Sequence, residues 1–298
     1  MYTAAFDISK ITKPVSDVGF IGNNNTKRIE IEYHNILDDV AGSVYEILNE
    51  YDNNDPNSVV DVLQLLQDYA NKLFDWSQDA VGGIIYKLND ESDREWQKHA
   101  KTMSGHLRYT LETAPVLPLM QDYMRQNVGL IQSMPLRAAE RVQELVLENL
   151  KTGKYRAEGL VDQIMNIGNV TKNRAKLIAR TEVSKMSTGL TMARSEATGI
   201  GWYVWKSSHD ARVRGSHNLM DQVLISWGDP PSPEALDNKK SYGHYHAGST
   251  FNCRCYCRPL LKIDDVSWPC KVYHNGSITR MRKADFMELS KGQVPMAA

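Results

Sequence analysis

The fold class is decided by residues 179–206, which read ARTEVSKMSTGLTMARSEATGIGWYVWK. Before Gly199 the apolar residues recur at intervals of four and three, the spacing of one buried helix face: Ala179, Val183, Met186, Leu190 and Ala193. After it, residues 202–206 (WYVWK) are aromatic and β-branched, which favours a strand. This stretch therefore contains a change from helical to mixed structure, and we predict an α+β fold.

The chain upstream of this boundary predicts a long, mostly helical region. Periodicity and capping residues indicate helices at about 29–52, 57–87, 91–126, 135–151 and 172–198. Short elements and turn residues follow Gly199, and a closing strand is expected at 254–261. We therefore predict four parts: an irregular segment 1–28, a helical domain 29–198, a small α+β module 199–262 and a C-terminal extension 263–298.

The composition indicates a folded protein. Of the 298 residues, 42% are hydrophobic and 24% are charged, which provides a core and argues against global disorder. The net charge of −1 gives no overall attraction to nucleic acid, so contact with DNA needs a local basic patch. The sequence contains no apolar run of membrane-spanning length, and residues 1–10 lack the pattern of a secretion signal. We expect the host cytoplasm as the compartment of synthesis.

Closely spaced cysteines and two upstream histidines predict a zinc site. Thiolate and imidazole groups suit tetrahedral zinc, which makes Cys253, Cys255 and His217 candidate ligands. Alternate residues of a regular strand lie about 6.6 Å apart, so Cys253 and Cys255 can share a metal only if the chain bends between them. Cys257 would lie about 13 Å from Cys253 in a regular strand, and His246 is therefore the predicted fourth ligand. A closed structural site is expected; the alternative is buried free thiols.

The order of motifs in the C-terminal module resembles a known family. A tryptophan-containing strand is followed by Asp210-Ala211-Arg212-Val213-Arg214-Gly215-Ser216-His217, a proline-rich turn and Asn252-Cys253-Arg254-Cys255. With the Arg180-Thr181-Glu182 step before them, these motifs resemble the Mu F-like family of phage head-morphogenesis proteins over about 170–262. Two departures are Thr250-Phe251, where many relatives have histidine and proline, and the additional thiol of Cys257.

The resemblance implies a structural role. It suggests a minor capsid protein, not an enzyme, that acts in head morphogenesis and DNA packaging, binds near the portal and is retained in the virion. The phage portal protein is the implied partner, with the major capsid protein and genomic double-stranded DNA as further candidates and no membrane contact. The expected location is the capsid interior or the portal vertex.

The residues also allow a catalytic interpretation of the same module. Asp210 could orient His217 as a general base while Arg212 and Arg214 hold a phosphate, as in a metal-dependent nuclease or other hydrolase. No nucleophile or glycine-rich phosphate loop accompanies them in the sequence. The alternative is that Asp210, Arg212 and Arg214 form a structural polar network.

A basic helix face is the candidate nucleic-acid or partner-binding surface. Lys172, Lys176 and Arg180 recur every four residues and so share one face of the predicted helix. Such a stripe could contact DNA phosphates or an acidic partner. The alternative is an ordinary solvated helix face.

Overall fold

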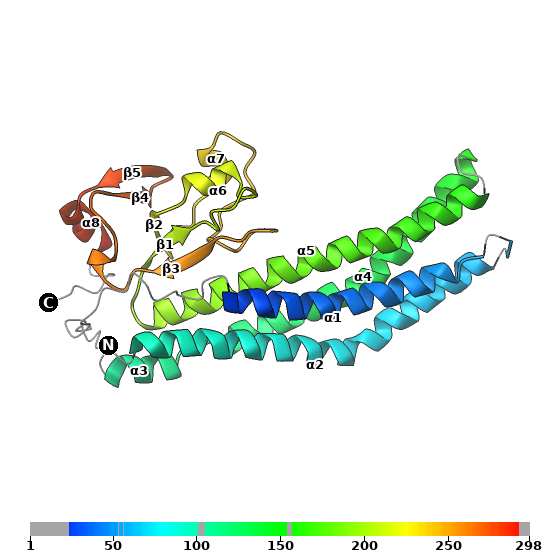
Figure 1. Cartoon of the computed structure of the whole chain (residues 1–298), viewed down its shortest axis with the longest axis horizontal. Coiled ribbons are helices and arrows are strands. Elements are labelled where there is room, and N and C mark those ends of the chain that lie inside the picture. The colour runs from blue at the N-terminus through cyan, green and yellow to red at the C-terminus, as the bar shows by residue number, and fades with distance from the viewer. Residues whose placement is uncertain (1–23, 53, 56, 101–104, 154–156, 292–298) are drawn as a thin grey trace. The chain divides into compact units, whose positions relative to one another are not determined.

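The computed structural model describes residues 24–291 except 53, 56, 101–104 and 154–156. It confirms the predicted α+β class, because long helices precede a small mixed sheet (Figure 1). The predicted irregular segment 1–28 lies largely outside the described residues. None of the described helices combines the length and apolarity needed to cross a membrane.

Within its described residues, the helical part contains four long helices and one short one: α1 (Asn24–Asn49), α2 (Ser58–Ala100), α3 (Gly105–Glu112), α4 (Leu117–Thr152) and α5 (Ala157–Ala197). Two predicted breaks are wrong. Helix α2 continues to Ala100, because Leu88 and Trp96 keep an apolar face buried beyond the expected end at 87. Helix α4 passes through Pro135, because buried Ile131, Met134, Ala138 and Val142 continue one face across it.

One compact unit, residues 28–86 and 120–182, has its core between four helices. Each helix contributes two fully or nearly buried residues to one cluster: Val44 and Leu48 (α1), Val62 and Leu66 (α2), Ala138 and Val142 (α4), and Leu160 and Ile164 (α5). Burying one such large aliphatic side chain contributes about 1.5–3 kcal/mol. The buried Tyr33 hydroxyl donates to Asn127 Oδ1 at 2.8 Å, which satisfies both polar groups inside this unit.

Among the described residues, the other unit comprises 24–27, 87–100, 105–119 and 183–291, so the division falls within α2 and α5. Arg194 of α5 is buried here, and its guanidinium donates to Ser92 Oγ and Asn89 Oδ1, both at 2.9 Å. A buried cation needs such partners, because desolvation alone is costly. The proposed independence of a module beginning near residue 199 stays a prediction.

A five-stranded sheet forms the centre of this unit. Its strands are β1 (Trp202–Lys206), β2 (Val223–Ser226), β3 (Tyr256–Pro259), β4 (Cys270–His274) and β5 (Ser277–Met281), in the order β3-β1-β2-β4-β5. Trp202 and Val204 enter the apolar cluster on one face, and Tyr203 and Trp205 enter the cluster on the other. Strand β1 is therefore buried on both sides, which explains why its sequence does not alternate between apolar and polar residues.

Three short helices follow β1 in the described part of this unit: α6 (Gly215–Leu219), α7 (Pro233–Leu236) and α8 (Lys283–Ser290), with a 3₁₀ turn at Ile263–Asp265. The structure differs here from the expected extension after residue 263. Strand β4 pairs in parallel with β2, and β5 pairs with β4. Helix α8 lies beside them (Figure 1), where Phe286 packs edge-to-face on Trp202 with ring centroids 4.9 Å apart. The last strands and helix are thus part of the sheet and its core.

Candidate metal centre

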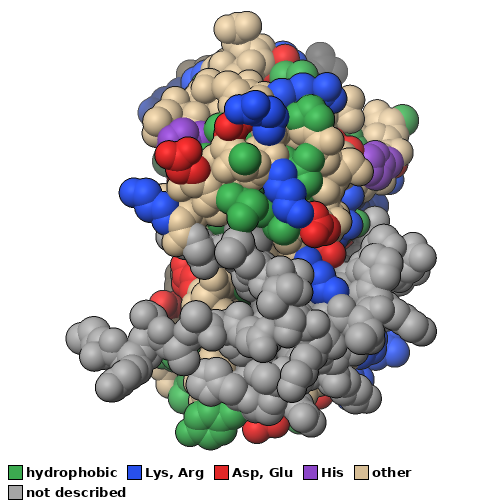
Figure 2. Space-filling view, turned by 90° about the vertical axis from the view of Figure 1, so that its left-hand side faces the viewer, with side chains coloured by type: hydrophobic (Ala, Val, Ile, Leu, Met, Phe, Trp, Pro, Cys, Tyr) green, Lys and Arg blue, Asp and Glu red, His purple; other side chains and the backbone are tan. Residues whose placement is uncertain are grey.

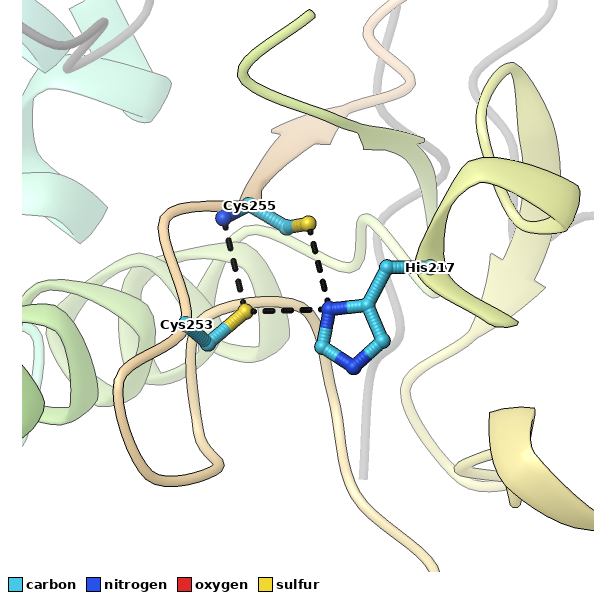
Figure 3. Close-up of side chains that lie close together, drawn as sticks. All are labelled: His217, Cys253 and Cys255. Carbon is cyan, nitrogen blue, oxygen red and sulfur yellow. Dashed lines mark hydrogen bonds between the residues drawn. The ribbon is translucent and has the colours of Figure 1, made fainter. Parts of the chain in front are cut away.

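Three predicted ligands lie together in the structure. The Nδ1 atom of His217 is 3.5 Å from the Sγ atoms of both Cys253 and Cys255 (Figure 3). All three side chains are buried, and the three possible ligand atoms lie within 4.8 Å of one another. Zn–N and Zn–S bonds near 2.0 and 2.3 Å at a tetrahedral angle separate nitrogen from sulfur by about 3.5 Å. The observed spacing therefore fits one shared zinc ion.

The local chain path brings both thiols to the same imidazole. His217 is on α6, which follows β1, whereas Cys253 and Cys255 lie in the loop that leads into β3 (Figure 3). Asn252 has a φ of 53°, a left-handed conformation that asparagine tolerates better than most residues. The Cys255 backbone N–H then donates to Cys253 Sγ at 3.4 Å. The bend that a shared metal requires is thus present, because the two cysteines precede the regular strand.

A buried polar relay fixes the orientation of the imidazole. Tyr245 donates its hydroxyl proton to Glu234 Oε2 at 2.6 Å, and its oxygen lies 3.0 Å from His217 Nε2. Ser216 donates to the other Glu234 oxygen at 3.2 Å. In the tautomer with its proton on Nε2, His217 donates to the tyrosine oxygen, and its Nδ1 lone pair faces the thiols. Support of this kind is typical of metal-binding histidines.

The two thiols differ in acidity. The hydrogen bond with Cys255 lowers the pKa of Cys253 well below its ordinary value, and contact with His217 acts in the same direction. The hydrogen bond with Cys253 and burial together raise the pKa of Cys255. A bound cation would favour the thiolate form of both cysteines.

The other two candidate ligands are placed elsewhere. His246 Nδ1 is 3.1 Å from the Tyr203 hydroxyl, and its ring packs edge-to-face on Trp227 with centroids 5.2 Å apart. Burial lowers the pKa of His246 to about 4, so this imidazole is neutral at physiological pH. Cys257 lies on β3 and donates to the Ala247 carbonyl at 3.5 Å. The structure does not bring either residue into the group of His217, Cys253 and Cys255.

Asp210 does not orient His217. Its Oδ1 accepts from the Arg212 backbone N–H at 2.9 Å and from the Arg254 guanidinium at 2.6 Å. The Arg212 N–H is the main reason why the pKa of Asp210 is lowered. Arg214 donates to the Phe251 carbonyl at 2.8 Å, and its guanidinium lies 4.3 Å from the centre of the Phe251 ring. These contacts link the 210–214 segment to the cysteine loop.

A small pocket lies against the donor group. Its volume is about 60 Å³, and the three candidate ligands form part of its wall. The rest of the wall is mostly polar: Ser208, Arg212, Val213, Arg214, Asn252 and Arg254. The candidate metal position is therefore adjacent to a space that a small ligand can enter.

The predicted basic stripe is partly engaged within the helical unit. Lys172 Nζ lies 5.2 Å from the centre of the Tyr45 ring, and Arg180 forms a partly buried ion pair with Glu30 at 3.3 Å. Lys176 is exposed. On the face seen in Figure 2, basic and acidic side chains are interspersed among the coloured residues. Two of the three predicted cations of the stripe, Lys172 and Arg180, therefore have partners within the helical unit.

Three arginines, Arg137, Arg141 and Arg174, line a pocket of about 400 Å³ in the helical unit together with Glu140 and Glu144, of which Glu144 pairs with Arg141 at 2.9 Å. Burial and the charge of Arg137 lower the pKa of Arg174. The interval of four residues between Arg137 and Arg141 was a readable signal for a shared face. Glu234 and Tyr245 were also missed, because nothing in their spacing links them to His217.

Comparison with known proteins supports the resemblance found in the sequence. Residues 140–258 match the family model described as Phage Mu protein F like protein. An uncharacterised protein of Haemophilus influenzae is 36% identical over 187 residues, which cover 62% of this chain and 39% of the relative. No solved structure gives a significant match. The chain is thus similar to the Mu F-like family over residues 140–258, which include the whole donor group.

Proposed function

We propose that the protein is a structural minor capsid protein that binds near the portal during head assembly and is retained in the virion. The observation that carries this proposal is the family match over residues 140–258. The portal protein is the proposed direct partner, and the major capsid protein and genomic DNA are secondary ones. Lys172 and Lys176 are the proposed contacts to DNA or to an acidic partner surface.

A complemented gene deletion tests this function. Phage lacking the gene should make portal and coat proteins but defective heads, and the full chain supplied in trans should restore infectivity. Mass spectrometry of purified virions should detect the chain, and a tagged chain should capture the portal protein from infected cells. Normal infectivity without the gene would contradict a role in head morphogenesis. Capture of the coat protein without the portal protein would contradict the portal as the direct partner.

We also propose that His217, Cys253 and Cys255 hold zinc. The proposal is supported by the donor types, the 3.5 Å spacing from nitrogen to each sulfur and the relay through Tyr245 to Glu234. Zinc would supply a cross-link between α6 and the loop before β3. Such a link stabilises a small module with short strands and many turns.

Elemental analysis of protein purified without chelator tests the zinc proposal. The wild-type chain should carry one zinc, and Cys253→Ala, Cys255→Ala or His217→Ala should each remove most of it. Cys270→Ala is the matched control, because Cys270 is half-buried and outside the donor group. A wild-type chain without stoichiometric zinc would contradict the proposal and favour the alternative, in which the cysteines are buried free thiols.

The second candidate function is a metal-dependent nuclease or other hydrolase. The observation in its favour is the pocket beside a three-donor site, because catalytic zinc keeps one position open. The binding of Asp210 to Arg254 removes the expected partner of a His217 base. Zinc-loaded protein should cleave double-stranded DNA if this function is real, and absence of cleavage at high protein concentration would exclude it as a nuclease.

A further inference from the structure

The donor group provides three of the four ligands that zinc takes in proteins. Within the part of the chain that the structure describes, the group consists of His217, Cys253 and Cys255. His246 contacts Tyr203 and Cys257 contacts Ala247, so neither completes the set. The fourth coordination position of the proposed zinc therefore needs a ligand that these residues do not supply.

The pocket beside the donor group limits the size of such a ligand. All three donors belong to its wall, so a metal held by them would face the pocket. A volume of about 60 Å³ admits a few water molecules or one small acidic group. The occupant is then a single small group that can coordinate a metal.

The charge of the pocket selects an anion. Arg212, Arg214 and Arg254 are in its wall, and the neighbouring carboxylate of Asp210 pairs with Arg254. The stack on Phe251 holds Arg214, whose guanidinium lies 3.5 Å from the His217 ring nitrogen Nε2. A zinc ion with two thiolates and a neutral imidazole has no net charge. The guanidinium groups therefore favour an anionic fourth ligand.

We propose that the fourth coordination position takes an exogenous oxyanion, a phosphate or carboxylate group, that also contacts Arg212. This inference rests on the proposed zinc site and adds its ligand class. The oxyanion binds through one oxygen to the metal, and its remaining oxygens accept hydrogen bonds from the arginine side of the pocket. The site is then an anion receptor whose metal and cations act together.

Cobalt substitution of the full chain tests this proposal. Co²⁺ in place of zinc gives visible absorption bands that change when a ligand in its coordination sphere is exchanged. Inorganic phosphate and acetate are titrated separately in a non-coordinating buffer. We expect a saturable spectral change, with the tighter of the two probes identifying the source as a phosphate or a carboxylate group. Arg212→Ala should weaken the response about tenfold, the loss of one charge-assisted hydrogen bond.

Arg282→Ala is the matched control, because this exposed arginine of the same unit pairs with Asp285 and is outside the pocket wall. It should leave the titration unchanged. Cobalt binding with a spectrum that neither anion alters would overturn the open position and leave the metal site intact. A chain that binds neither cobalt nor zinc would overturn both proposals. If wild type and Arg212→Ala bind the anions with equal affinity, the proposed contact between Arg212 and the oxyanion is wrong.

Discussion

Tyr245 is the side chain on which the orientation of His217 depends. Its hydroxyl group lies between His217 and Glu234 and hydrogen-bonds to both. Tyr245→Phe should therefore remove the contact that orients the imidazole without changing the shape of the core. Loss of such a supporting contact lowers metal affinity about 10- to 100-fold. Competition with a chromophoric chelator measures the effect. Tyr242→Phe is the control, because Tyr242 is exposed; equal affinities in the two variants would contradict the relay.

His246 should make stability depend on pH. Its pKa is lowered by burial to about 4 in the folded chain, against 6.5 for an ordinary histidine. As pH falls below 6.5, the unfolded state binds a proton that the folded state does not, so stability is full above 6.5 and falls toward pH 4. The loss is up to about 3 kcal/mol. Urea unfolding of wild type and His246→Asn at pH 7 and 5 measures this loss. If the free energy of unfolding falls between these two pH values as much in the variant as in wild type, His246 is not its cause.

The residue types of the candidate metal centre could be predicted from the sequence, whereas the side chains that hold them in place could not. Cys253, Cys255 and His217 carry soft-ligand chemistry that can be read from the sequence. The placement of His246 follows from its aromatic neighbours Tyr203 and Trp227, which lie far from it in sequence. The burial of Glu234 could not be predicted either, because nothing in the sequence around a single glutamate shows that it will be buried.

Among the elements, α5 meets the cysteine loop at Gly248. This glycine has a φ of 86°, and a Cβ added to it would lie 2.6 Å from Thr188 Oγ1 and 3.0 Å from the Cys255 carbonyl oxygen. Gly248→Ala should therefore cost the strain of a left-handed alanine, about 1 kcal/mol, and in addition displace the loop from α5. Gly243→Ala is the control, because it has φ 97° but nothing within 4 Å. Thermal melting should show a clearly larger loss for Gly248→Ala; similar losses would mean that close packing is unimportant.

The helix-to-strand change at Gly199 was predictable, because period and residue types change together there. The hairpin of β4 and β5 was missed, although Asn275-Gly276 is a signal for a tight turn and both residues have positive φ. Its flanking strands are short and half-exposed, so they lack the apolar alternation that marks a strand. The pairing of β4 with β2 is non-local and could not be read from either segment alone.

For the molecule as a whole, metal removal should affect the two compact units unequally. Trp202, Trp205, Trp227, Trp268 and Trp96 belong to the unit with the sheet, whereas Trp76 belongs to the helical unit. Tryptophan fluorescence thus reports mainly on the former, and far-ultraviolet circular dichroism mainly on the long helices. Structural zinc contributes several kcal/mol. A chelator should lower the fluorescence melting temperature more than the dichroism one; equal shifts, or none, would contradict a stabilising metal in the sheet unit.

The parallel pairing of β2 with β4 has a consequence for how the chain acquires its structure. Parallel neighbours need a crossover, and here residues 227–269 supply it, including the loop of Cys253 and Cys255. Such non-local pairing forms slowly, and a ribosome releases the chain from its N-terminus. His217 and both cysteines therefore precede β4 in the order of synthesis, so a metal held at the proposed site would tie α6 to the crossover and shorten the free chain that the pairing of β4 with β2 has to close.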